Sequence, residues 1–192
     1  ENGGDGIILQ ADLMDEGAVA GIIVKASEWR GRVDVLINNA AIFEEGDFSN
    51  TSSENWDRHF AINLKAPFLL SQSFAGQIPE NGQGKIIFIS DWRGVRPGVG
   101  HFAYTLTKST LITMTKSVAR VVAPRITVNA IALGAILPPE GAEEGFLARK
   151  IETIPLRRSG SPSDVVATVQ FLLEGSDFIT GETIVVDGGE HL

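Results

Sequence analysis

Short apolar runs alternate with segments of helical periodicity along the whole chain. Nearly uninterrupted apolar runs predict buried strands over residues 7–12, 33–37, 85–89 and 126–131, and a further strand over 181–187 that ends at two glycines. Between these runs, apolar residues spaced three and four apart predict helices near residues 15–26, 51–68, 104–122 and 161–173. Residues 137–150 carry no clear periodicity and are expected to be irregular.

Capping signals mark the start of two of these helices. Thr51-Ser52-Ser53-Glu54 and Ser161-Pro162-Ser163-Asp164 both have the form of a capping box, the second with proline at the first helical position. The side chains expected on the buried side of the first helix are Trp56, Phe60, Leu64 and Phe68. Asp12 is expected either to cap the helix that follows it or to contact a ligand, and the sequence leaves both open.

Strands separated by helices predict a parallel sheet, because right-handed crossovers return each strand in the same direction. We therefore expect a doubly wound α/β fold of Rossmann type, with helices on both faces, formed as one domain by residues 1–192. Ligands bind such sheets at the carboxyl ends of the strands. The residues that fall there are Asp12, Asn39, Ser90, Asp91 and Gly134.

Composition narrows the choice of partners. The 192 residues have a formal net charge of -8 and scattered basic residues, which disfavours nucleic acid and anionic membranes as partners. The chain contains no cysteine, and its histidines at 59, 101 and 191 lack metal-ligand spacing, so we expect no disulfide and no metal. A small-molecule substrate and a cytoplasmic location fit this composition best.

Tyr104 and Lys108 form the strongest candidate for chemistry. They lie four residues apart at the start of a predicted helix, so both side chains point to one face. A neighbouring cation is expected to lower the pKa of the phenol toward the range useful for proton transfer. Taken alone, such a pair is more often an ordinary solvated helix face. Asn63 is a second candidate, since a mid-helix asparagine among apolar residues needs a partner or a function.

The order of short motifs along the chain resembles that of the short-chain dehydrogenase/reductase family. The matching segments are Ala11-Asp12-Leu13, Asn38-Asn39-Ala40-Ala41, Asn63, Ile89-Ser90-Asp91, Tyr104 with Lys108, Val128-Asn129-Ala130-Ile131-Ala132 with Gly134, and the ending from Ile179-Thr180-Gly181 to Val186-Asp187-Gly188-Gly189. The resemblance implies an NAD(P)-dependent oxidoreductase that works as a homotetramer or homodimer. It covers the whole chain.

The resemblance also assigns roles to individual residues. Tyr104 would be the acid or base, Lys108 would hold the cofactor ribose, and Asn63 would anchor a proton-relay water. Asp12, beside Leu13, would meet the adenine. The remaining cofactor contacts would come from Asn39, Ala40, Ala41, Ser90, Gly134 and Ile136.

Two departures from the family pattern shape these expectations. The family's glycine-rich phosphate turn should precede residue 7, so we expect roughly 50 residues, containing two strands, to be missing from this chain. Those strands would lie between the strands at 7–12 and 33–37; a true short form is the alternative. The other departure is Asp91, 13 residues before Tyr104, where the family usually has a catalytic serine. Leu133 also replaces a proline that is common before Gly134.

An aspartate at this place resembles the pteridine reductase branch, which includes dihydromonapterin and dihydrofolate reductases. The resemblance implies NADPH-dependent reduction of a pterin or folate-like C=N bond, with NADH left open. If Asp91 helps to deliver the proton, its side chain should lie about 2.6 to 3.2 Å from Tyr104 or from a substrate ring nitrogen, or one water away. Alternatively, Asp91 caps the loop through Trp92 and Arg93, and Ser90 serves a carbonyl reductase or alcohol dehydrogenase. A non-catalytic dinucleotide-binding or assembly protein is the alternative of a different class.

Overall fold

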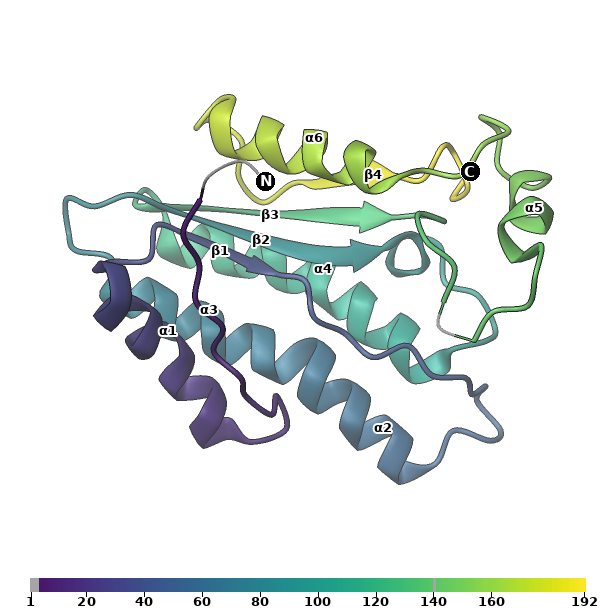
Figure 1. The fold of residues 1–192 in the computed structure, drawn as a ribbon, viewed down its shortest axis with the longest axis horizontal. Helices are drawn as coiled ribbons and strands as arrows, with labels where there is room; N and C mark the ends of the chain where they lie inside the picture. Colours follow the sequence, from purple (N-terminus) through teal and green to yellow (C-terminus); the bar gives the residue numbers. More distant parts are fainter. Residues whose placement is uncertain (1–3, 140) are drawn as a thin grey trace.

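The computed structural model describes residues 4–139 and 141–192 (Figure 1). A central sheet is formed by β1 (Val35–Asn38), β2 (Gly84–Asp91), β3 (Ile126–Leu133) and β4 (Thr183–Val186). The helices are α1 (Glu16–Arg30), α2 (Ser53–Phe60), α3 (Ala66–Gln77), α4 (Phe102–Val122), α5 (Phe146–Ile151) and α6 (Pro162–Glu174). A π-helical turn, Ala61–Lys65, joins α2 to α3, and a 3-10 turn, Trp92–Gly94, follows β2. None of the helices in the described ranges is long and apolar enough to cross a membrane.

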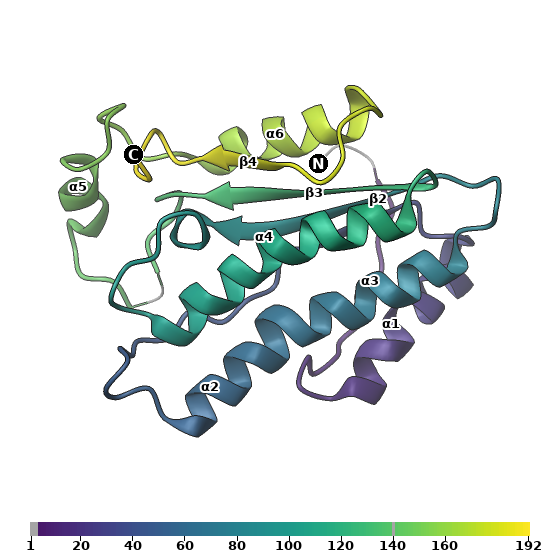
Figure 2. The ribbon, with the colours of Figure 1, turned by 180° about the vertical axis from the view of Figure 1, so that it is seen from behind.

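All four strands are parallel and lie in the order β1-β2-β3-β4. Helices α1, α3 and α4 cover one face of the sheet, and α6 lies on the other (Figures 1 and 2). This arrangement confirms the predicted parallel sheet with helices on both faces.

Burial on both faces explains why β2 reads as a continuous apolar run. Successive side chains of a strand point to opposite faces, so the central positions of a doubly covered strand are apolar in succession, as in Ile86 to Ile89. Ile86 and Phe88 pack in the core beneath the helical layer that contributes Phe74. Ile87 and Ile89 pack on the opposite face, against the side of the sheet that α6 covers.

The strand expected over residues 7–12 is a wrong prediction. These residues form no strand in the structure, and the side chain of Ile8 is 96% exposed. A strand exists only where its backbone groups pair with a neighbour. Within the described residues β1 pairs with β2 alone, so its other edge meets no strand, and Val35 and Ile37 are partly exposed.

The helix expected over residues 51–68 is interrupted by the π-helical turn, and the face that it buries is not the one predicted. Ser52, not Thr51, is the N-cap and accepts a hydrogen bond from the backbone N–H of Asn55 at 3.1 Å. Trp56 and Phe68 are 36% and 45% exposed, so the apolar stripe faces outward there. The inward face carries the buried polar side chains of His59 and Asn63, because both form hydrogen bonds to the segment that follows β1.

Other helix boundaries divide between correct and incorrect predictions. Helix α4 ends at Val122 as predicted, and Ser161 and Asp164 form the expected capping box of α6. The irregular stretch predicted for 137–150 instead contains the start of α5 at Phe146. Asp15 caps α1, whereas Asp12 only accepts a local hydrogen bond from the Met14 N–H at 2.9 Å, so Asp12 is not the helix cap.

Candidate active site

The end of β2 and the first turns of α4 bring Asp91 and Tyr104 together. The Tyr104 hydroxyl donates a hydrogen bond to Asp91 Oδ2 at 3.0 Å, within the expected range. The other carboxylate oxygen accepts the Arg93 backbone N–H at 2.8 Å, and the Arg93 guanidinium lies 3.7 Å from it. Asp91 therefore caps the following turn, as one alternative expected, while it also contacts Tyr104.

Ser90 points away from this pair. Its side chain is buried, and its hydroxyl donates a hydrogen bond to the Lys108 backbone carbonyl at 3.0 Å. Adjacent residues in a strand project to opposite faces, so Ser90 and Asp91 do not share a direction. The structure thus places the aspartate, and not the serine, beside the Tyr104 hydroxyl.

Lys108 lies beneath the Tyr104 ring, with Nζ 5.4 Å from the ring centroid. The ammonium donates a hydrogen bond to the Ile89 carbonyl at 2.8 Å, and only 3% of the residue is exposed. Burial lowers the pKa of Lys108 to about 8, and the charge of Asp91 opposes this shift. Lys108 therefore loses its proton at a lower pH than an exposed lysine does.

The expected lowering of the Tyr104 pKa is wrong for this arrangement. Burial, followed by the charge of Asp91 and its hydrogen bond, raises the pKa of Tyr104 well above its usual value, and Arg93 only partly opposes this. The physical cause is that a buried phenolate beside a carboxylate is poorly solvated and repelled. Tyr104 is consequently protonated at neutral pH, in the state needed to donate a proton.

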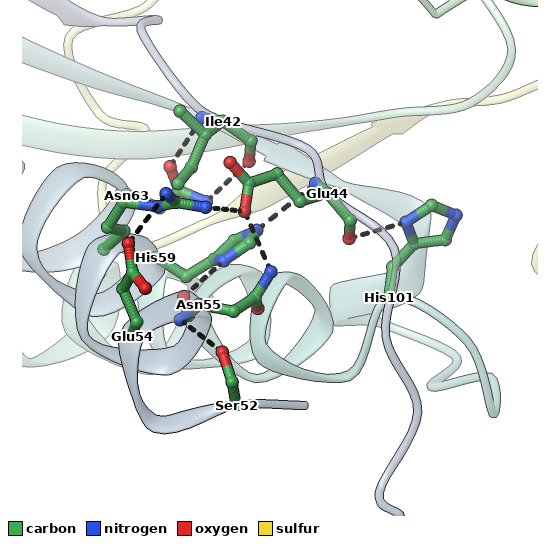
Figure 3. A network of polar contacts seen from close by, with 9 residues as sticks. Ile42, Glu44, Ser52, Glu54, Asn55, His59, Asn63 and His101 are labelled. Carbon is green, nitrogen blue, oxygen red and sulfur yellow. Dashed lines mark hydrogen bonds and ion pairs between the residues drawn. The ribbon is translucent and has the colours of Figure 1, made fainter. Parts of the chain in front are cut away.

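Asn63 fastens the chain segment that follows β1. Its side chain accepts a hydrogen bond from the Ile42 N–H at 2.8 Å and donates one to the Ile42 carbonyl at 2.9 Å (Figure 3). It also donates to the Thr107 hydroxyl at 3.4 Å, next to Lys108 in α4. These contacts give Asn63 the partners that a buried mid-helix amide requires, and its proposed role toward a relay water stays a prediction.

Two histidines hold the same segment at its next residues. The Glu44 N–H donates to His59 Nε2 at 3.4 Å, and His101 Nδ1 lies 3.0 Å from the Glu44 carbonyl (Figure 3). Phe43, between these anchors, stacks on the His101 ring at 3.9 Å and meets the Tyr104 ring edge-on at 4.7 Å. The sequence analysis considered the histidines only as metal ligands and did not predict these contacts with residues 43 and 44, because the contacts form only in the folded chain.

A pocket opens directly beside Asp91 and Tyr104. Its other lining residues come from the segment after β1, the turn after β2, the segment between β3 and α5, α5 itself and the carboxyl-terminal segment. They are Phe43, Trp92, Arg93, Gly134, Ala135, Leu137, Pro139, Phe146, Lys150 and Glu190. Of these, sequence reasoning singled out only Gly134 as a site residue, because the others carry no motif and lie far apart along the chain.

The residues predicted to hold a cofactor are only partly assembled around this pocket. Asn39, Ala40 and Ala41 follow β1 and are exposed, and the buried Oδ1 of the adjacent Asn38 has no hydrogen-bond partner within residues 4–139 and 141–192. The structure gives Ile136 no place in the lining of the pocket, although it directly follows Ala135. Asp12 and Leu13 lie in the turn before α1 and are likewise not among the lining residues.

Known proteins that are similar to this chain in sequence include oxidoreductases. Residues 1–191 match the family model described as enoyl-(acyl carrier protein) reductase. The uncharacterized oxidoreductase YohF of Escherichia coli is 36% identical over 189 residues, which cover 95% of this chain and 74% of that protein. The 3-oxoacyl-[acyl-carrier-protein] reductase FabG of Staphylococcus aureus is 34% identical, over 99% of this chain and 79% of FabG.

A solved structure extends the agreement to three dimensions. FolM alternative dihydrofolate reductase 1 from Brucella canis, complexed with NADP, superposes with a TM-score of 0.92 and 38% identity. The match covers 98% of this chain and 74% of FolM, so the chain spans about three quarters of this relative. With a family model matched along nearly its whole length, the chain belongs to the short-chain dehydrogenase/reductase family of NAD(P)-dependent oxidoreductases.

Proposed function

We propose that this enzyme is an NADPH-dependent reductase of a C=N bond in a pterin or folate-like ring. The observation that carries the proposal is the 3.0 Å hydrogen bond from Tyr104 to Asp91. A phenol paired with a carboxyl group is suited to protonating a ring nitrogen, whereas carbonyl reduction calls for a hydroxyl group that hydrogen-bonds the oxygen. Ser90, the nearest hydroxyl on β2, is engaged with the Lys108 carbonyl instead.

The preference for NADPH rests on similarity alone. The similar FolM structure is a complex with NADP. Small exposed side chains at Ala40 and Ala41 leave room for a flat ring. In the proposal these residues, Asn39 and Gly134 with Ile136 hold the cofactor, Lys108 holds its ribose, and Asp12 and Leu13 meet its adenine. When bound, NADPH supplies the hydride.

Tyr104 and Asp91 supply the proton in the proposed reaction. One hydride adds to the carbon of the C=N bond, and one proton adds to the nitrogen, so the bond becomes CH–NH. Because its pKa is raised, Tyr104 carries its proton at neutral pH and can give it to the substrate nitrogen. The negative charge then left near Tyr104 lies close to two cationic side chains, Lys108 and Arg93.

A second candidate, reduction of a carbonyl group, is favoured by the likeness to FabG, which is named as a 3-oxoacyl reductase. The two functions are separated by NADPH oxidation assays with dihydrobiopterin, dihydrofolate and a panel of ketones and 3-oxoacyl thioesters. We expect turnover with a dihydropterin and none above background with the carbonyl panel. Turnover with the panel alone would refute the pterin proposal.

We further propose that the enzyme acts as a homotetramer or homodimer. An apolar hollow lies between the α2–α3 region and α4, and Phe60, Leu64, Phe68 and Met114 are among its lining residues. Burying such a patch against a second copy removes apolar surface from water. Exposed apolar residues of α6, such as Val166 and Phe171, offer a second contact. Sedimentation that shows only monomer at micromolar concentration would contradict this proposal.

A further inference from the structure

The pocket beside Tyr104 has an ion pair on its wall that the proposed proton transfer does not use. Lys150, in the last turn of α5, and Glu190, in the segment after β4, both line the pocket. Lys150 Nζ lies 2.8 Å from Glu190 Oε1 and 5.5 Å from the centroid of the Trp92 ring. The pair therefore joins, at the wall of the pocket, two segments that are far apart in the sequence.

The carboxylate of Glu190 is buried, and in the described part of the chain only one of its two oxygens has a hydrogen-bond partner. Its side chain is 5% exposed, whereas that of Lys150 is 28% exposed. Oε1 is bound by Lys150, but Oε2 is buried and has no hydrogen-bond partner among the described residues. Buried carboxylate oxygens are normally hydrogen-bonded, and a donor on a bound molecule can satisfy this one once the Glu190 side chain turns toward the pocket.

The charges around the pocket restrict which molecule that is. The ionic side chains that line it in the described part of the chain form two pairs, Arg93 with Asp91 and Lys150 with Glu190. These residues therefore offer no unpaired cation to a carboxylate or phosphate, and the carboxylate of Glu190 would repel one. An uncharged donor, a hydroxyl or an N–H group, suits Oε2.

We infer that Glu190 is a specificity residue, which accepts a hydrogen bond from a hydroxyl or N–H group on the substrate tail and disfavours tails that carry carboxylates. The inference rests on the proposed pterin reduction. Because Tyr104, Lys150 and Glu190 line the same pocket, the inferred binding mode has the reacting ring beside Tyr104 and the tail directed toward Lys150 and Glu190. The enzyme then prefers a dihydropterin with a short hydroxylated tail over dihydrofolate, whose glutamate tail has two carboxylates.

The test compares kcat and KM for dihydrobiopterin and dihydrofolate in the parent enzyme and in Glu190→Gln. Removing the charge weakens the hydrogen bond to the hydroxylated tail and releases Lys150 to meet a carboxylate. We expect the preference for dihydrobiopterin, as a ratio of kcat/KM values, to fall about tenfold or more. The change should lie in KM, because Glu190 is not beside the reacting atoms.

Two further variants make the test decisive. Glu152→Gln removes the same charge from an exposed position just after α5 and should leave the ratio unchanged. Lys150→Met keeps an apolar stem near Trp92 but leaves Glu190 without its cation, so it should raise the preference for dihydrobiopterin. If Glu190→Gln does not fold, Lys150→Met still tests the inference through the same ratio of kcat/KM values.

The outcomes separate this inference from the proposed function. If the parent reduces dihydrobiopterin but neither pocket variant alters the ratio beyond the Glu152→Gln control, Glu190 does not set specificity and the inference is overturned. The same holds if the parent prefers dihydrofolate. If the parent reduces neither pterin, the proposed function fails first and this inference with it.

Discussion

The buried ammonium of Lys108 makes the stability of this protein depend on pH in a direction that can be worked out. Burial lowers the pKa of Lys108 from 10.5 to about 8 in the folded chain. Below pH 8 the lysine is charged in both folded and unfolded states, and burying that charge costs stability. Between pH 8 and 10.5 the folded chain has lost the proton while the unfolded chain keeps it. Stability therefore rises with pH across this window and the cost is gone above it.

The size of the effect follows from the gap between the two pKa values. That gap corresponds to about 3 kcal/mol in the free energy of unfolding, with a slope near 1.4 kcal/mol per pH unit inside the window. Tyr104 acts oppositely only above pH 10, because its raised pKa lets the folded chain keep a proton that the unfolded chain has lost. Measurements between pH 7 and 9.5 therefore isolate Lys108.

Urea unfolding of the parent and of Lys108→Met at several pH values measures this slope. Methionine keeps much of the buried stem and removes the titrating group. It leaves the Ile89 carbonyl without its donor, which shifts stability by an amount that does not depend on pH. We expect the parent to gain about 2 kcal/mol relative to the variant between pH 7 and 9.5. Parallel curves for the two proteins would show that Lys108 keeps an ordinary pKa and would refute the reasoning.

Three other substitutions have distinct expected results. Tyr104→Phe should lower turnover by roughly a hundredfold or more and leave NADPH affinity within a few-fold of the parent, measured by steady-state kinetics and cofactor titration. Gly134→Ala should destabilise the fold by about 1 to 3 kcal/mol in urea unfolding, because the new Cβ would lie 2.5 Å from Asp187 Cβ. Ser161→Ala should cost about 1 kcal/mol in the same assay by removing the α6 cap, and an unchanged midpoint would show that Asp164 suffices there.

The parallel sheet was predictable because its signal is local. The apolar run of β2 requires burial on both faces, and the capping box at Ser161 fixes the start of α6, so neither depends on distant residues. Residues 7–12 carry the same kind of run but form no strand. Pairing with a neighbour is a property of the whole chain, and an apolar run alone does not supply it.

The candidate site was predictable where it rests on spacing and not where it rests on distant contacts. The four-residue spacing of Tyr104 and Lys108 placed both in one helix, and counting back from Tyr104 identified Asp91. The direction of the Tyr104 pKa shift was missed because burial and the Asp91 carboxylate, which raise the pKa, outweigh the charge of Arg93, which lowers it. Glu190 was missed because no motif marks it and its partner lies 40 residues earlier in the chain.

The proposed use of Asp91 as half of a proton-donating pair is tested most directly by exchanging it for serine. Asp91→Ser and, as the matched change on the same strand, Ser90→Ala are assayed with dihydrobiopterin and with a ketone panel. We predict that Asp91→Ser loses most pterin reduction while keeping or gaining carbonyl reduction, and that Ser90→Ala changes neither by more than a few-fold. If Ser90→Ala is the damaging change and Asp91→Ser is silent on every substrate, Asp91 has no part in proton delivery.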